Sequence, residues 1–233
     1  MNYKIYVTLL FLMYVSLIHG QSLENAPKEV FEIIKANKSK LGSVKQLIVV
    51  YNDSVQSYKA VLIALEKKKN KWVITSGPMN TYIGRNGFAA PDAKLEGDGK
   101  SPTGLFRLGQ LFCYKDSVNT ALPHIQTTAD DKWIDDPESD DYNKYVRGET
   151  SAKTFEKLLI RSDAYKYCMV IEFNTHPVVK GKGSAIFFHL GTEATSGCVT
   201  ILEEQMELIL STLTPKANPS ILMGNFEVLR KGL

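Results

Sequence analysis

The chain has 233 residues, of which 44% are hydrophobic and 23% charged, a composition that excludes a disordered, collagenous or polytopic membrane protein. Its formal charge of +3 arises from 28 Lys and Arg interspersed with 25 Asp and Glu, so no nucleic-acid footprint is present. We expect one large globular domain whose partner is not nucleic acid, and which meets a membrane only through its N-terminus.

Residues 1–20 have the outline of a secretory signal peptide. Lys4 supplies an early positive charge, the apolar run Ile5–Ile18 follows, and the small residue Gly20 ends the segment. The apolar run is shorter than the roughly 20 residues that cross a bilayer as a helix. We predict cleavage after Gly20 and export, with an uncleaved membrane anchor as the alternative.

The next segment has the spacing of an amphipathic helix. Between Ala26 and Leu41 the apolar residues recur every three or four positions, Pro27 suits a first turn, and Gly42 suits the end of the helix. The sequence therefore predicts an N-terminal helical segment (residues 21–44) that packs on a larger domain (residues 45–233).

Most of the larger domain is typical of a β structure. Short β-branched or aromatic runs, which predict strands, occur at 46–51, 59–65, 71–75, 168–174 and 184–190. The charged turn at 67–70 joins two of them, and a Gly- and Pro-rich stretch (77–104) and an acidic loop (130–143) separate the others. The expected fold class is mainly β, a β-rich α+β domain with peripheral helices.

Three cysteines have different surroundings in the sequence. Cys113 and Cys168 lie in apolar, strand-like runs, whereas Cys198 lies in a polar turn. After Cys198, the apolar residues of 201–213 keep helical spacing until Pro215, so we expect Cys198 at the start of a helix. In an oxidising compartment two of the three thiols can pair. A disulfide between Cys113 and Cys168 and two buried free thiols are both open interpretations.

The sequence contains no complete cofactor-binding motif. Gly99-Lys100-Ser101 resembles the end of a phosphate-binding loop, but Lys94 stands where that motif needs Gly, and Pro102 blocks the helix that should follow. The acidic loop lacks the spacing of an EF-hand, and no His and Cys residues have the spacing of a zinc site. We expect neither a metal nor an organic cofactor.

His189 and Cys198 form a pattern that is typical of a catalytic pair of cysteine and histidine. A strand-like apolar run ends in His189, and a short loop returns to Cys198. A neighbouring imidazole and a helix N-terminus can lower the pKa of a thiol from about 8.5 into the range ~3.5–7.5. Gly197 lets the backbone turn so that amide groups face a developing oxyanion. The alternative is a core histidine beside an incidental thiol.

Several segments, in order, resemble the active-site region of the L,D-transpeptidase (YkuD-like) family, in its branch with a short loop between His and Cys. The matching segments run from about residue 45 to 224 and are GDGKSPTGLF at 97–106, WIDDP at 133–137, YN at 142–143, YCMVIEFNTHPV at 167–178, GSAIFFH at 183–189, TSGCV at 195–199 and ILMG at 221–224.

This resemblance implies a mostly β catalytic domain of an exported enzyme that acts on peptidoglycan stem peptides. Cys198 would be the nucleophile and His189 its base, oriented by the backbone carbonyl of Leu190 or Gly191. The amide groups of Gly197 and Cys198 would form much of the oxyanion hole. The resemblance also favours the pairing of the other two cysteines, because relatives often carry Gly at those positions.

Two departures from the family pattern affect the expected substrate site. Ser196 stands where better-known members have a second His before the nucleophile, and Val199-Thr200 replaces a frequent Arg after it. Recognition of the substrate carboxylate must then fall to other residues. The candidate substrate-binding residues are Ser196, Lys100, Arg85, Arg147 and Tyr142.

The resemblance implies cleavage of the bond between the L-centre of a diamino acid and a terminal D-Ala, through a Cys198 thioester, with transfer of the acyl group to an amine. Two alternatives stay open. One is hydrolysis at the same site, by an L,D-carboxypeptidase or by an amidase that releases a wall-linked protein. The other is a non-catalytic peptidoglycan-binding module. The expected location is the periplasm or cell envelope of a bacterium, and the oligomeric state is not predicted.

Overall fold

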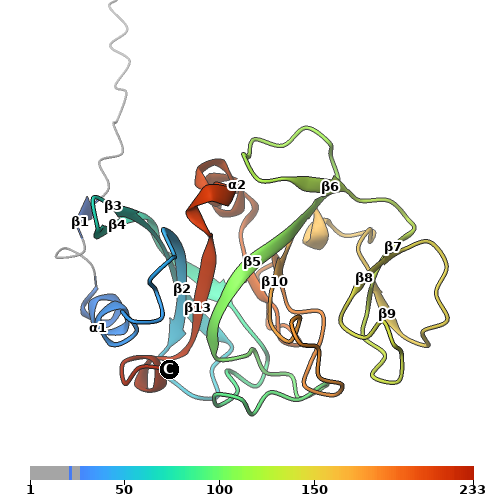
Figure 1. Ribbon diagram of the computed structural model, residues 1–233, viewed down its shortest axis with the longest axis horizontal. Coiled ribbons are helices and arrows are strands. Elements are labelled where there is room, and N and C mark those ends of the chain that lie inside the picture. Colours follow the sequence, from blue (N-terminus) through green and yellow to red (C-terminus); the bar gives the residue numbers. More distant parts are fainter. Residues whose placement is uncertain (1–20, 23–26) are drawn as a thin grey trace, which may run out of the picture.

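The computed structural model describes residues 21–22 and 27–233, so the expected signal peptide lies outside the described residues (Figure 1). Of the described residues, 36% lie in strands and 14% in helices, which confirms the mainly β class. The strands are β1 (Gln21–Ser22), β2 (Gln46–Asn52), β3 (Lys59–Lys68), β4 (Lys71–Tyr82), β5 (Gly104–Cys113), β6 (His124–Gln126), β7 (Asp131–Ile134), β8 (Tyr145–Arg147), β9 (Phe155–Lys157), β10 (Tyr167–Ile171), β11 (Phe187–Leu190), β12 (Val199–Ile201) and β13 (Ser220–Asn225). The helices are α1 (Lys28–Ala36), α2 (Glu203–Thr212) and α3 (Phe226–Leu229), with the 3-10 turns η2 (Asp163–Tyr165) and η3 (Pro215–Ala217).

The main sheet closes on itself. Its strand order is β1-β4-β12-β11-β10-β5-β13-β2-β3, and the last strand, β3, also pairs with the second, β4, which closes the sheet. A closed sheet encloses a core on its inner face and exposes an outer face that other elements must cover. β6 extends the sheet beside β5.

Alternate residues of each strand supply two different cores. In β2, Ile48 and Val50 belong to the cluster inside the closed sheet, whereas Leu47 and Val49 belong to a cluster on its outer face. A strand that is covered on both faces needs apolar residues at every position rather than at every second one. This explains why the run at 46–51 is continuously apolar.

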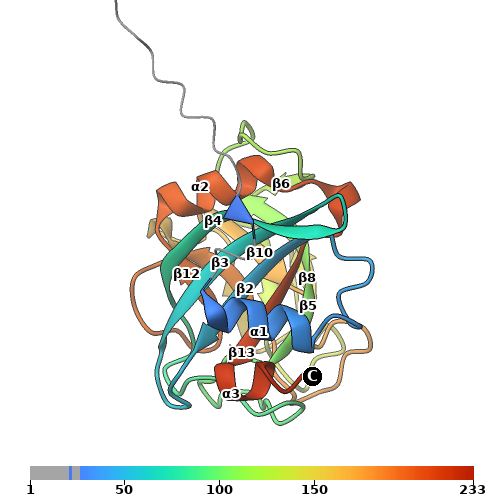
Figure 2. The ribbon, with the colours of Figure 1, turned by 90° about the vertical axis from the view of Figure 1, so that its left-hand side faces the viewer.

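α1 and α3 cover the outer face of the β2 and β3 side, on the left in Figure 1 and toward the viewer in Figure 2. α1 buries Val30, Ile33 and Ile34 against the sheet, as its spacing predicted. It ends at Ala36, earlier than expected, because the Asn37 side chain donates hydrogen bonds to the carbonyls of Ile33 and of Leu229. That contact fixes the helix to α3.

A small three-stranded sheet, β8-β7-β9, lies on the opposite side of the molecule (Figure 1). Trp133 of β7 and Tyr165 of η2 pack edge-on against Phe187 of β11. The resulting cluster covers the outer face of β10 and β11 and contains Cys198. The candidate site is therefore formed where this small sheet meets the closed one.

The segment after Cys198 is a strand, so the expectation of a helix that starts at this residue is wrong. Val199 and Ile201 point into the inner core, and β12 pairs in parallel with β11. α2 begins only at Glu203, where the side chain of Gln205 accepts a hydrogen bond from the Leu202 amide. Cys198 therefore does not lie at a helix N-terminus, and the stabilisation of a thiolate that such a position was expected to supply has to come from elsewhere.

The expected disulfide is also wrong, since all three cysteines are free thiols. Cys113 pairs with Tyr167 across β5 and β10, while Cys168 pairs with Phe112. The register places Cys113 in the inner core and Cys168 in the outer cluster. Side chains on opposite faces of one sheet point apart, and such cysteines cannot be bridged without moving the backbone.

Two kinds of feature are absent from the described residues. None of the helices there is both long and apolar enough to cross a bilayer. No group of three or more His, Cys, Asp or Glu side chains in the same residues is arranged to hold a metal ion.

Candidate active site

The strand register brings His189 and Cys198 to the same face of the sheet. Phe188 pairs with Val199 and both face the inner core, so their neighbours His189 and Cys198 face outward. They are diagonal neighbours across β11 and the start of β12, a separation that side chains can span. Both line one cavity of about 540 Å³. The two residues that the sequence singled out are thus brought together.

Cys198 is held by two backbone groups of the preceding segment. Its Sγ–H donates to the carbonyl of Ala185 at 3.3 Å, and the Phe187 amide donates to Sγ at 3.3 Å. Burial raises the pKa of the thiol to about 12, with a further increase from the negative charge of Glu156. The Phe187 hydrogen bond and the positive charge of Lys94 act in the opposite direction. The thiol is therefore protonated at neutral pH.

His189 has a fixed orientation and is neutral. Its Nδ1 lies 2.9 Å from the carbonyl of Leu190, so Nδ1 carries the hydrogen and Nε2 keeps its lone pair. Of the two carbonyls that the resemblance offered, Leu190 is the one in contact. The ring of Tyr165 packs edge-on against the imidazole, with the centroids 4.9 Å apart. Burial lowers the pKa of His189 to about 4, so at neutral pH Nε2 can accept a proton.

Gly197 is required by close packing rather than by an open oxyanion hole. A Cβ there would lie 2.9 Å from the Ile186 side chain and 3.0 Å from the Lys100 carbonyl. The amide of Gly197 donates to Thr195 Oγ1 at 3.0 Å, and that hydroxyl donates to the Cys198 carbonyl at 2.8 Å. In this conformation the Gly197 amide already donates to Thr195, so it would have to leave that hydroxyl to take the oxyanion role that the resemblance implies.

The GDGKSPTGLF segment supports the loop that precedes Cys198. Ser101 is fully buried, and its hydroxyl donates to the Gly197 carbonyl at 2.6 Å while it accepts from the Gly84 amide at 2.9 Å. It therefore joins three segments of chain at the nucleophile loop. Lys100 contacts this loop through its backbone, and its side chain does not line the cavity. Its predicted role in binding substrate is not supported by this position.

Arg85 and Ser196 are the predicted substrate-binding residues that do line the cavity. Arg85 Nη1 donates to Ser196 Oγ at 3.0 Å, two residues before Cys198. Among the residues that the structure describes, Arg85 has no ion-pair partner. A free guanidinium at this place can bind a carboxylate.

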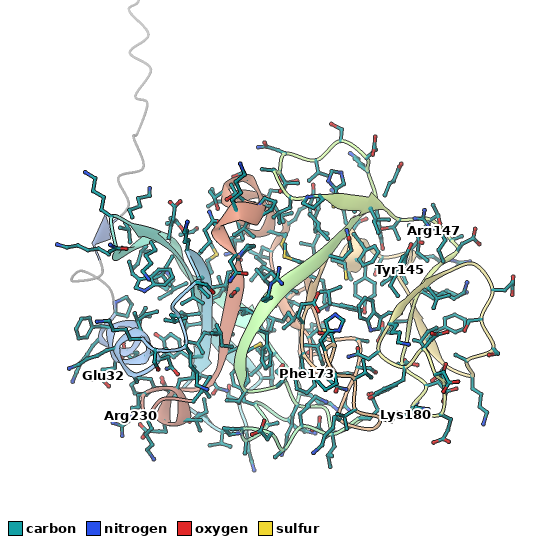
Figure 3. The ribbon with its side chains drawn as sticks, in the orientation of Figure 1. Glu32, Tyr145, Arg147, Phe173, Lys180 and Arg230 are labelled. Atoms are coloured by element: carbon teal, nitrogen blue, oxygen red, sulfur yellow. The ribbon has the colours of Figure 1, made fainter. Side chains whose placement is uncertain are left out.

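Arg147 and Tyr142, two of the predicted substrate-binding residues, do not line the cavity that holds His189 and Cys198. Arg147 forms a two-point ion pair with Asp131, next to Tyr145 on the β7–β9 side (Figure 3). Burial alone would raise the pKa of Asp131, but its hydrogen bonds with Arg147 and Tyr145 outweigh this and hold the pKa well below its usual range. Tyr142 is buried and bonds with Glu96.

The sequence analysis missed Ala185, whose backbone carries the contact to the thiol. Ala185 has a φ of +51°, a conformation that costs a residue with a Cβ about 1–3 kcal/mol and persists only where its surroundings impose it. The side-chain oxygen of Asn143 accepts a hydrogen bond from the Ala185 amide at 3.1 Å and another from the indole of Trp133 at 2.8 Å. The WIDDP and YN segments thus hold the strained residue in place.

Lys94 is a second missed residue and the nearest buried cation. It is 4% exposed, and its Nζ donates to Asp98 at 2.8 Å and to the Leu95 carbonyl at 2.7 Å. Its side chain passes under Gly197 and Gly183, where a Cβ would lie within 3.8 and 3.2 Å of it. It supplies positive charge beneath the nucleophile loop, which a helix N-terminus was expected to supply.

Comparison with known proteins identifies the family. A family model described as "YkuD: L,D-transpeptidase catalytic domain" matches residues 46–221, most of the chain. The chain belongs to the L,D-transpeptidase catalytic domain family, a family of peptidoglycan enzymes.

Among solved structures, the helical cell shape determining protein Pgp2 from Campylobacter jejuni is similar at 14% identity, with a TM-score of 0.40. The match covers 85% of this chain and 55% of that one, so this chain spans about half the length of that protein. No match was found among curated proteins.

Proposed function

We propose that this protein is an exported L,D-transpeptidase, a cysteine acyltransferase that acts on peptidoglycan stem peptides in the cell envelope. The observation that carries the proposal is the meeting of Cys198 and a neutral, oriented His189 in one cavity, within the region that matches the family. The apolar N-terminus with its small final residue supports export.

The proposed reaction begins when Sγ leaves the Ala185 carbonyl and gives its proton to Nε2 of His189. The thiolate attacks the carbonyl carbon that joins a diamino acid to D-Ala, and a tetrahedral oxyanion forms. When this collapses, the C–N bond breaks, His189 returns the proton to the leaving amine, and a Cys198 thioester remains. An amine then gives its proton to His189 and attacks the thioester; the C–S bond breaks, the new amide leaves, and His189 returns the proton to Sγ.

Arg85, assisted by Ser196, is proposed to bind the carboxylate of the terminal D-Ala. Its guanidinium lines the cavity, lacks an anionic partner among the described residues, and is joined to the loop that carries Cys198. Such a contact would position the scissile bond against Sγ. Water in place of the amine would give a carboxypeptidase from the same site.

Intact-protein mass spectrometry with a disaccharide-tetrapeptide, with and without an amine acceptor, tests the proposal. We expect a covalent adduct on Cys198, release of D-Ala, and a cross-linked product when the amine is present. Loss of D-Ala without cross-linking would assign the carboxypeptidase instead. A folded protein that gives neither adduct nor product would favour the binding module.

The variants Cys198→Ala and His189→Ala should each lose almost all turnover, because nucleophile and base act as a unit. Cys113→Ala is the matched control: burial raises the pKa of this thiol to about 12 as well, but Cys113 lies inside the closed sheet. It should keep the adduct. Thermal unfolding of all three variants checks that they fold, and a fully active His189→Ala protein would contradict the assignment.

A further inference from the structure

Glu156 is a carboxylate in the cavity that the proposed reaction does not use. It lies in the middle of β9, opposite Trp133 of β7, and lines the same cavity as His189 and Cys198. One of its oxygens accepts the Tyr165 hydroxyl at 2.6 Å. No Lys, Arg or His in the described part of the chain forms an ion pair with it.

An unpaired carboxylate in such a place is costly to keep. Burial raises the pKa of Glu156, which expresses the cost of holding its charge away from water. Thr200 of the same cavity has a buried hydroxyl oxygen, Oγ1, that makes no hydrogen bond. Both groups would gain partners from a polar ligand, and a cation is the ligand that suits Glu156.

Arg85 and Glu156, two of the charged residues that line the cavity, lie beside different members of the catalytic pair. Arg85 contacts the nucleophile loop through Ser196, whereas Glu156 contacts Tyr165, whose ring packs on His189. A ligand that carries a carboxylate and, elsewhere, an ammonium group could form an ion pair with Arg85 and another with Glu156 at the same time.

We propose that Glu156 binds the side-chain ammonium group of the diamino acid in the acyl donor, while Arg85 binds the donor's carboxylate. This inference rests on the proposed transpeptidase function and names the residue that recognises its substrate. The diamino acid, rather than a neutral residue of the same length, is then the feature that the enzyme selects.

The contact would also act on the nucleophile. The charge of Glu156 raises the pKa of the Cys198 thiol in the free protein. An ammonium group docked on Glu156 would cancel that repulsion, so that binding of the correct donor and ionisation of the thiol favour each other. The thiol would thus stay protonated until the donor arrives.

The test compares two tetrapeptide donors that differ only in the side-chain amine, which is free in one and N-acetylated in the other. The rate of adduct formation on Cys198 is measured by intact-protein mass spectrometry. Wild type should prefer the free amine by about 10-fold to 100-fold, the size expected of a hydrogen bond between charged groups. Glu156→Gln, which keeps an oxygen for the Tyr165 hydroxyl, should lose most of that preference. It should also alkylate with iodoacetamide faster than wild type at pH 8.

Two control variants distinguish the effect of the Glu156 charge from a structural effect of the substitution. Glu193→Gln removes an exposed carboxylate at the rim of the same cavity and should keep the preference. Tyr165→Phe removes the hydroxyl that contacts Glu156 but leaves the carboxylate, so the preference should again remain. Loss of the preference in Tyr165→Phe would assign Glu156 a structural role and overturn the proposal.

The remaining outcomes distinguish this inference from the function on which it rests. Equal rates for the two donors in wild type would overturn the proposed role of Glu156 but leave the transpeptidase function unaffected. Because this comparison uses wild type alone, it tests the proposal even if Glu156→Gln fails to fold. An unchanged preference in a folded Glu156→Gln would do the same. If wild type forms an adduct with neither donor, the proposed function fails and this inference fails with it.

Discussion

At the scale of single residues, the free protein holds its two proposed catalytic groups, the Cys198 thiol and the His189 imidazole, in their neutral forms. Burial raises the pKa of Cys198 to about 12 and lowers that of His189 to about 4, so both are neutral at pH 7. A neutral pair is stable in a cavity where an unassisted ion pair would be costly. Proton transfer therefore has to be coupled to substrate binding, through Arg85 and Glu156 in our proposal.

The His189 pKa predicts the acid limb of the activity profile. A histidine base fails when it is protonated, and protonation here requires a pH near 4 rather than the ordinary 6.5. Because burial raises the pKa of Glu156, this carboxyl would also take up a proton as the pH falls, so the profile is measured in Glu156→Gln. In that variant we expect kcat/KM to stay nearly constant as the pH falls from 7 to 5 and to decline around pH 4. Measurement of kcat/KM for D-Ala release from pH 3.5 to 8, with circular dichroism as a check of folding, tests this. A limb centred near 6.5 would contradict it.

At the scale of elements, the local sequence pattern predicted those strands that contain a continuous apolar run. The runs at 46–51, 59–65 and 71–75 correspond to β2, β3 and β4, although β4 continues to Tyr82 through part of the expected loop. β12 was mistaken for the start of a helix because three residues are too few to show a period of two. Its pairing with β11, which defines it, is not visible in local sequence.

Only part of the candidate site could be predicted from the sequence. His189 and Cys198 lie nine positions apart and are joined by one loop, so their spacing and family pattern were enough to single them out. Glu156 and Lys94 reach the site from separate segments through the topology of the fold, and the role of Ala185 comes from a backbone conformation rather than from its side chain. A single sequence has no local signal for such contacts. The disulfide expectation failed for a related reason, since the strand register decides which face each cysteine occupies.

Ser101 provides a test of how the elements position the nucleophile. Its buried hydroxyl joins the Gly84 amide to the Gly197 carbonyl. Ser101→Ala should leave both backbone groups without that partner, lower the free energy of unfolding by about 1–3 kcal/mol, and slow adduct formation on Cys198. Urea unfolding and adduct kinetics measure the two effects.

The matched control for Ser101 is Ser211→Ala, an exposed serine whose hydroxyl bonds within α2 to the Leu208 carbonyl. This variant should match wild type in both measurements. If Ser101→Ala loses stability but forms the adduct at the wild-type rate, the GDGKSPTGLF segment supports the fold without positioning the nucleophile.

At the scale of the whole molecule, one closed sheet separates an inner core from two outer ones, and neighbouring strands contribute to all of them. One core cannot open unless strands that also line another core are separated from their neighbours. We therefore expect the closed sheet to unfold as one cooperative unit, even though its apolar residues form three clusters.

The three free thiols test this cooperativity. Cys113 and Cys168 are fully buried in different cores, whereas Cys198 is 8% exposed in the cavity. In native protein without reductant, a thiol reagent should label Cys198 first. Cys113 and Cys168 should follow much more slowly and at a common rate, set by global opening, and all three should label at once in denaturant. Peptide mapping by mass spectrometry over time, with Cys198→Ala to isolate the slow pair, gives the rates. Earlier labelling of Cys168 than of Cys113 would show that the outer cluster opens alone, and resistance of both in denaturant would restore the disulfide.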